Sequence, residues 1–178
     1  MNNNQIFTNL ITCVKAALTA NSISGWSVAQ NYTPAQGNYP RPIILIHKLG
    51  TFTEGWQSRA DKKDTDGILK HYETQQSYIL FRLEALKNRD ITKPEEDTAA
   101  DVLDCVRAYF NGNEGIKLLR SYGLNPYRIE NIEEPEYTTE NDVFEFHPFF
   151  DFKVVIFKEY KKPQAAVTAA EIKTIKGV

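Results

Sequence analysis

The sequence is poor in the residues from which metal and redox centres are usually built. Only two of its 178 residues are cysteine (Cys13 and Cys105), and its three histidines (His47, His71 and His147) are scattered singly. Neither set has the short, repeated spacing that a zinc site or a disulfide framework requires. We interpret both cysteines as small buried hydrophobic residues of a protein in a reducing cytoplasm, and expect no metal and no cofactor.

Motifs for phosphate binding and nucleophilic catalysis are also missing. The chain contains no GxxxxGK[ST], no GxGxxG and no GxSxG, so Walker loops, dinucleotide-binding turns and nucleophile elbows lack their signatures. A net charge of −2 without a polybasic run argues against nucleic-acid binding as the main function. The N-terminus has no cationic segment before its apolar stretch, and Lys15 interrupts that stretch. We expect neither a signal peptide nor a membrane span, and no membrane partner.

One triplet has a catalytic look. Glu159-Tyr160-Lys161 at the end of an apolar strand resembles the ExK element of metal-dependent nucleases. That chemistry needs a second carboxylate close enough to share a metal ion. Asp151 lies eight residues earlier on the same predicted strand, on the order of 26 Å away at ~3.3 Å per residue. We interpret the triplet as a solvated strand end and predict that the protein is not an enzyme.

The strongest positive signal is the two-residue alternation between Val143 and Tyr160, which predicts one long strand. Pro148 cannot donate to a sheet ladder, so it marks a bulge or an edge. The face of this strand that lies opposite its predicted core face mixes apolar and charged residues, which suggests that the sheet also contacts partner subunits. The predicted core face consists of Phe150, Phe152, Val154 and Ile156, and the mixed face of Phe149, Asp151, Lys153, Val155 and Phe157.

The first half of the chain predicts one helix followed by strands. Apolar residues recur at helical spacing over residues 4–20 (Phe7, Leu10, Ile11, Val14 and Leu18). Short strands are predicted at 26–32 and 43–49, then a polar loop from Gly50 to Gly67. A long strand follows at 68–86, and its polar first half is expected to project beyond the core as a hairpin arm.

The second half predicts two helices and two strands. Thr92-Lys93-Pro94-Glu95 has capping-box spacing and would open a helix that stops at Gly112. A shorter helix, 114–122, would end at Gly123, and a strand is expected at 127–132. The fold class predicted from this order is α+β, an antiparallel β-sheet with long strands and helices packed on one face. We expect one domain over 1–162 and a tail over 163–178 that either orders on assembly or is a frayed terminus without a role.

Large aromatic residues in the polar loop suggest where partners would bind. Phe52 and Trp56 either fold back on the sheet or anchor a subunit interface, where aromatic residues are enriched. In the second case residues Gly50 to Ser77 would form a projecting segment that is mobile in the monomer and ordered in the assembly. The candidate assembly interface comprises Phe52, Trp56, Arg59, Tyr72, Phe149 and Phe157.

With its elements in this order, the chain resembles the tail terminator (tail completion, or neck) proteins of tailed bacteriophages over most of residues 4–161. The resemblance rests on the N-terminal amphipathic helix, IILIHKL, YETQQSYILFRLEAL, DTAADVLDCVRAYF and NDVFEFHPFFDFKVVIF. It implies an α+β fold and a homo-oligomeric ring, commonly a hexamer, at the head-proximal end of the tail. Such a ring stops tube polymerisation and joins tail to head. The implied partners are the tail tube protein and a neck, connector or head-completion protein. Nucleic acid would enter only as the genome passing through the ring, in a virion assembled in the host cytoplasm.

Two other classes of function remain open at this stage. A small α+β enzyme or ligand-binding domain would place its pocket between sheet and helices. A nucleic-acid module of ferredoxin-like type could use the basic spots Lys62-Lys63 and Lys161-Lys162, although the near-neutral net charge counts against it. The leading hypothesis is a non-enzymatic virion protein, with the 50–67 loop projecting toward the ring axis or the tube.

Overall fold

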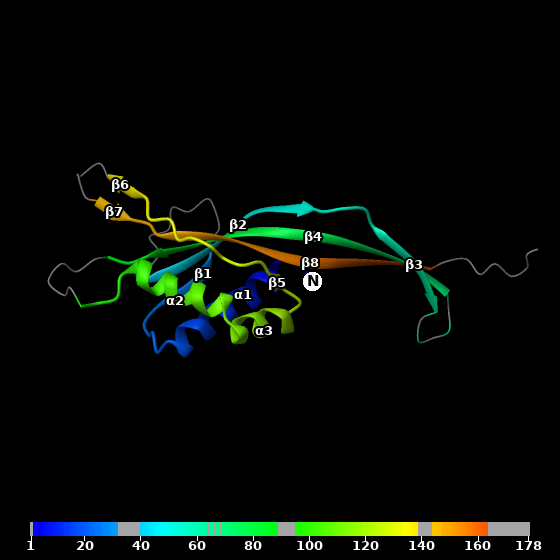
Figure 1. The fold of residues 1–178 in the computed structure, drawn as a ribbon, viewed down its shortest axis with the longest axis horizontal. Helices are drawn as coiled ribbons and strands as arrows, with labels where there is room; N and C mark the ends of the chain where they lie inside the picture. Colours follow the sequence, from blue (N-terminus) through cyan, green and yellow to red (C-terminus); the bar gives the residue numbers. More distant parts are fainter. Residues whose placement is uncertain are drawn as a thin grey trace, which may run out of the picture.

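The structure is a computed structural model that describes residues 2–31, 40–63, 65, 67, 69–88, 95–138 and 144–163. Its helices are α1 (Asn3–Ala20), α2 (Ala99–Asn111) and α3 (Asn113–Ser121), and they cover one face of the main sheet (Figure 1). The predicted α+β class is confirmed. The strands of the main sheet are β1 (Ser27–Gln30), β2 (Ile43–Thr53), β3 (Ser58–Lys63), β4 (Leu69–Leu86), β5 (Asn125–Pro126) and β8 (Phe149–Pro163).

The order of the main sheet is β1-β2-β4-β8-β5, with β3 also paired to β4. All of these pairs are antiparallel except β1 with β2, so the sheet is mixed rather than wholly antiparallel as predicted. The connection from residue 31 to 42 has the length of about a dozen residues that a parallel return requires. The sheet is not closed, and its two long strands, β4 and β8, run side by side (Figure 1).

The core lies between the helices and the inner face of the sheet. All four residues predicted for the core face of the final strand are buried there. Phe152 is at the centre, 2% exposed, with its ring centroid 5.6 Å from that of Phe81 and 5.7 Å from that of Phe110. Phe7 of α1 meets Phe81 edge-on at 5.7 Å. Aromatic packing thus joins α1 and α2 to the two long strands.

Helix α2 begins later than the sequence predicts. Its N-cap is Thr98, whose hydroxyl oxygen accepts a hydrogen bond from the Asp101 amide at 3.2 Å, while the Asp101 carboxylate accepts one from the Thr98 amide at 2.9 Å. The predicted start of this helix is therefore wrong, because residues 95–98 are not helical; the first three residues of the predicted capping box, Thr92, Lys93 and Pro94, lie outside the described part. Thr98 has the same spacing to an acidic residue and directly precedes the first buried position, Ala99. The end of α2 before Gly112 is confirmed.

Two predicted strands need correction. The strand predicted from Val143 is broken before Phe149: β7 (Phe144–Phe146) pairs with β6 (Glu136–Thr138) in a separate two-stranded sheet. The break includes Pro148, as expected of a residue that cannot donate. The strand predicted at 127–132 is not formed; its place beside β8 is taken by β5, one step earlier.

The predicted polar loop from Gly50 to Gly67 is also wrong. β2 continues to Thr53, and β3 occupies residues 58–63, so both lie along β4. Their side chains lack apolar alternation, but hydrogen bonding to β4 satisfies their backbones, which a pattern of side chains does not reveal. The predicted projection of β4 beyond the core is confirmed (Figure 1). We call residues 55–63, which include β3, residues 69–76 and residues 157–163 the arm.

The predicted tail, 163–178, lies outside the described residues except for Pro163, which ends β8. Cys13 is buried as predicted, but Cys105 is only partly buried. In the described part of the chain, the helices are too short or too polar to span a membrane.

Candidate assembly surface

An ordered cluster of aromatic and charged side chains occupies the outer face, the face of the sheet opposite the helices. The ring of Phe52 on β2 stacks on Tyr78 of β4, with centroids 4.9 Å apart and planes 18° apart. The Lys153 ammonium lies 3.6 Å from the Tyr78 centroid and 4.8 Å from that of Tyr127. Phe52 therefore packs on a neighbouring strand while 45% of it stays exposed. The alternative that Phe52 folds back on the sheet holds in part, and its role at a subunit interface stays a prediction.

Lys153 connects this cluster to the end of β2. Its ammonium is 3.1 Å from a carboxylate oxygen of Glu54. Desolvation pushes the pKa of Lys153 down, but the hydrogen bond to Glu54 and the nearby acidic groups outweigh it, so the pKa is raised. Lys153 therefore stays protonated, and its ion pair holds Glu54, the residue at which the turn between β2 and β3 begins.

Trp56 lies on the turn between β2 and β3, and hydrogen bonds from Gln75 stabilise the backbone of this turn. The buried amide of Gln75 donates to the backbone oxygens of Glu54 at 3.0 Å and Gly55 at 3.4 Å. Gly55 takes a φ of +68°, a left-handed conformation that glycine adopts without strain. Trp56 itself is 99% exposed and borders an open hollow of about 610 Å³ with Arg59 and Gln75. A large apolar ring that is exposed to water is of the kind that partners cover at protein interfaces, so the predicted role of Trp56 stays a prediction.

Three more of the predicted interface residues lie on the arm. Arg59 is exposed on β3, its guanidinium nitrogen 3.8 Å from the Glu73 carboxylate. Tyr72 is partly buried on β4, at the register position opposite Ala60. Phe157 on β8 is 62% exposed. With Phe52 and Trp56, five of the six residues lie along the arm and the adjoining part of the sheet.

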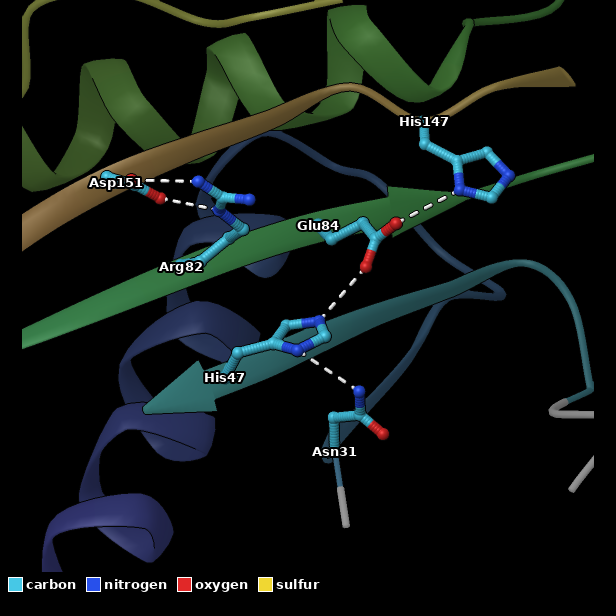
Figure 2. Close-up of polar contacts among 6 residues, drawn as sticks. All are labelled: Asn31, His47, Arg82, Glu84, His147 and Asp151. Carbon is cyan, nitrogen blue, oxygen red and sulfur yellow. Dashed lines mark hydrogen bonds and ion pairs between the residues drawn. The ribbon is translucent and has the colours of Figure 1, made fainter. Parts of the chain in front are cut away.

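The sixth residue, Phe149, lies apart and is only 9% exposed. The Arg82 guanidinium covers its ring at 3.7 Å from the centroid. The same guanidinium holds the Asp151 carboxylate with two hydrogen bonds, at 2.7 and 3.0 Å (Figure 2). This bidentate pair occupies the carboxylate considered for a nuclease site. Phe149 is therefore a weak candidate for direct contact with a partner.

A network of polar contacts lies at the end of the outer face that carries Phe149 and the Arg82–Asp151 pair. The Glu84 carboxylate lies 3.0 Å from His47 Nε2 and 3.1 Å from His147 Nδ1, while His47 Nδ1 is 3.1 Å from the Asn31 amide nitrogen (Figure 2). The hydrogen bond from His47 lowers the pKa of Glu84, against the opposing effect of burial. The network ties β2, β4 and the β7–β8 connection together. In the described part, no three His, Cys, Asp or Glu side chains are placed to hold a metal ion.

Sequence reasoning missed the residues that organise this surface. Tyr78 and Glu54 gave no signal, because each resembles an ordinary residue of a polar strand or loop, and Lys153 stood out only as one charged residue of the mixed face. The register of β4 against both neighbours brings them together, and register is set by the whole sheet rather than by local pattern.

Comparison with known proteins supplies a family and a fold. A family model described as E217 gateway protein gp29 matches residues 5–166. Among solved structures, the chain is similar to the sheath/tube terminator of an extracellular contractile injection system, PVC, in its extended state. That likeness has a TM-score of 0.52 at 10% identity, over 96% of this chain and 63% of that one. A search of curated proteins found no match. The predicted resemblance to tail terminators is confirmed.

Proposed function

The chain belongs to the family of the E217 gateway protein gp29, and from that membership we propose that it is a virion structural protein that ends a phage tail. In this proposal a ring of copies sits at the head-proximal end of the tail, stops polymerisation of the tail tube, and joins the tail to the neck or connector. The fold it shares with a sheath/tube terminator supports the proposal.

The observation that carries the proposal is the arm with its exposed aromatic residues. Strands β4 and β8 extend well beyond the helices (Figure 1), and a single subunit leaves Trp56 and Phe157 in water. Apolar surface of this kind is stabilised when a partner covers it. A contact repeated around an axis closes into a ring when the rotation matches, and a closed ring can cap a growing tube.

The partners in this proposal are other copies of the chain, the tail tube protein and a neck or head-completion protein, with the genome passing through the ring. The role is structural rather than catalytic. The alternative of a ligand-binding domain finds less support, because the hollows beside Trp56 and beside α2 open at the surface rather than between sheet and helices.

The test measures oligomerisation and tube length together. Purified protein should form a discrete oligomer by light scattering, and its addition to polymerising tube protein should shorten the tubes in proportion to its concentration. Trp56→Ala should keep the fold but shorten tubes less effectively. Leu49→Ala, which removes another exposed apolar side chain outside the arm, should behave as wild type. A chain that stays monomeric at all concentrations and leaves tube length unchanged would refute the proposal.

A further inference from the structure

The two ends of this elongated molecule carry opposite charge. The arm is at one end of the long axis, and the start of α2 with the β6–β7 hairpin is at the other (Figure 1). The register places Lys62 of β3 opposite Lys70 of β4, and His71 of β4 opposite Lys162 of β8. The basic spots that stand a hundred residues apart in the sequence thus meet on the arm. The arm has seven basic residues (Arg59, Lys62, Lys63, Lys70, Lys158, Lys161, Lys162) and three acidic residues (Asp61, Glu73, Glu159).

Two carboxylates of the arm, Asp61 and Glu73, lie close to basic side chains of the arm. Asp61 lies 2.6 Å from His71 Nδ1, and Glu73 lies 3.4 Å from His71 Nε2 and 3.8 Å from Arg59. Lys62 and Lys63 are exposed on β3. With seven basic and three acidic residues, the arm carries a net positive charge, and Lys62 and Lys63 present part of it to solvent.

At the opposite end, four carboxylates surround a surface hollow of about 470 Å³: Asp101, Asp104, Glu130 and Glu134. All four residues are exposed. Arg107 also lines the hollow, but its guanidinium is held at 2.6 Å by Asp104 and at 3.0 Å by the backbone oxygen of Glu130. Even with that arginine the hollow is acidic.

We propose that the basic arm of one copy docks against this acidic end of the next copy, around the hollow beside α2. The inference rests on the proposed ring and names the surfaces that would build it. Such a contact joins two different patches and is therefore heterologous, the kind that generates rings when the rotation closes. The eight arm residues of β4 extend on the order of 26 Å at ~3.3 Å per residue, enough to overlap a neighbour. Lysines on β3 also discourage unspecific pairing of the exposed edge.

Charge exchange tests this contact directly. One variant carries Lys62→Glu and Lys63→Glu, and the other carries Glu130→Lys and Glu134→Lys. The first variant neutralises the arm and sets two glutamates against the acidic hollow, and the second makes the hollow basic like the arm. We therefore expect each alone to need at least about tenfold more protein than wild type to assemble. An equimolar mixture of the two should restore assembly, because where the variants alternate the substituted glutamates of one meet the substituted lysines of the other. Assembly of wild type should also weaken as salt is raised.

The controls separate folding, charge and function. Circular dichroism and thermal unfolding of each variant establish that it folds. Lys15→Glu with Lys117→Glu makes the same change in net charge at exposed helix positions and should assemble as wild type. If wild type forms rings but the charge variants assemble equally well, or the mixture fails to recover, the docking surfaces are wrong while the proposed function stands. If wild type forms no oligomer, both fall. If the arm variant assembles normally yet loses binding to duplex DNA, the basic arm serves nucleic acid and the docking proposal is overturned.

Discussion

Replacing Phe152 by alanine measures how much the inner face of the final strand stabilises the fold. The side chain is 2% exposed and packs against Phe81, Phe110 and Phe150. A buried phenylalanine removes about 150–250 Å² from water, or about 4–6 kcal/mol at ~25 cal/mol per Å². Measured Phe→Ala costs are about 3–5 kcal/mol. We expect a loss in that range, a large share of the total stability of a domain.

The matched control is Phe157→Ala, five residues along the same strand but on the outer face and 62% exposed. It should cost less than about 0.5 kcal/mol, as surface substitutions do. For a chain of this size, 3–5 kcal/mol corresponds to a fall in Tm of about 6–20 °C. Thermal unfolding measures the Tm of both variants. The protein concentration is held fixed, because assembly also stabilises the fold. Equal losses in the two variants, or a larger loss for Phe157→Ala, would refute the assignment of faces.

Three other outcomes follow from the packing and charges. Burial raises the pKa of Cys13 to about 12, so at pH 8 a thiol reagent should modify the partly buried Cys105 first; equal rates would contradict this. Gly115→Ala would place a Cβ against the Tyr109 backbone oxygen and should lower the free energy of unfolding by about 1–3 kcal/mol. Gly112→Ala is the control, because its closest contact would be at 3.3 Å, and it should lower that free energy less. Equal losses would count against the close approach of α2 and α3. The pKa of Glu84 is lowered from its usual 4.5, so its stabilising effect is present above pH 4.5 and lost as pH falls through the lowered value. The stability gap between wild type and Glu84→Gln should therefore narrow in acid, and a constant gap would contradict the role of the carboxylate.

The sequence predicts the parts of this fold that have an apolar rhythm. The alternation of Phe150, Phe152, Val154 and Ile156 and the helical spacing in α1 are signals of burial, and both predictions are confirmed. The polar segment 50–67 carries no such rhythm, and its strand structure depends on backbone pairing with β4. The start of α2 was misplaced because two threonines six residues apart share the same spacing to an acidic residue.

The assembly surface is less accessible to sequence reasoning than the fold. Exposed aromatic residues in a polar segment identified Phe52 and Trp56, since they stand out locally. The Arg82 guanidinium covers the Phe149 ring, and basic residues from three strands lie together on the arm. Both arrangements depend on the register between strands that are distant in the sequence. Side-chain pattern alone does not determine that register.

Cryo-electron microscopy of assembled tails that contain this protein tests the central claim most directly. The account predicts one closed ring of this chain on the head-proximal end of each tail tube. In that ring the arm of each subunit contacts the acidic end of its neighbour. Copies spread along the tube, or a ring at the opposite end of the tail, would contradict it.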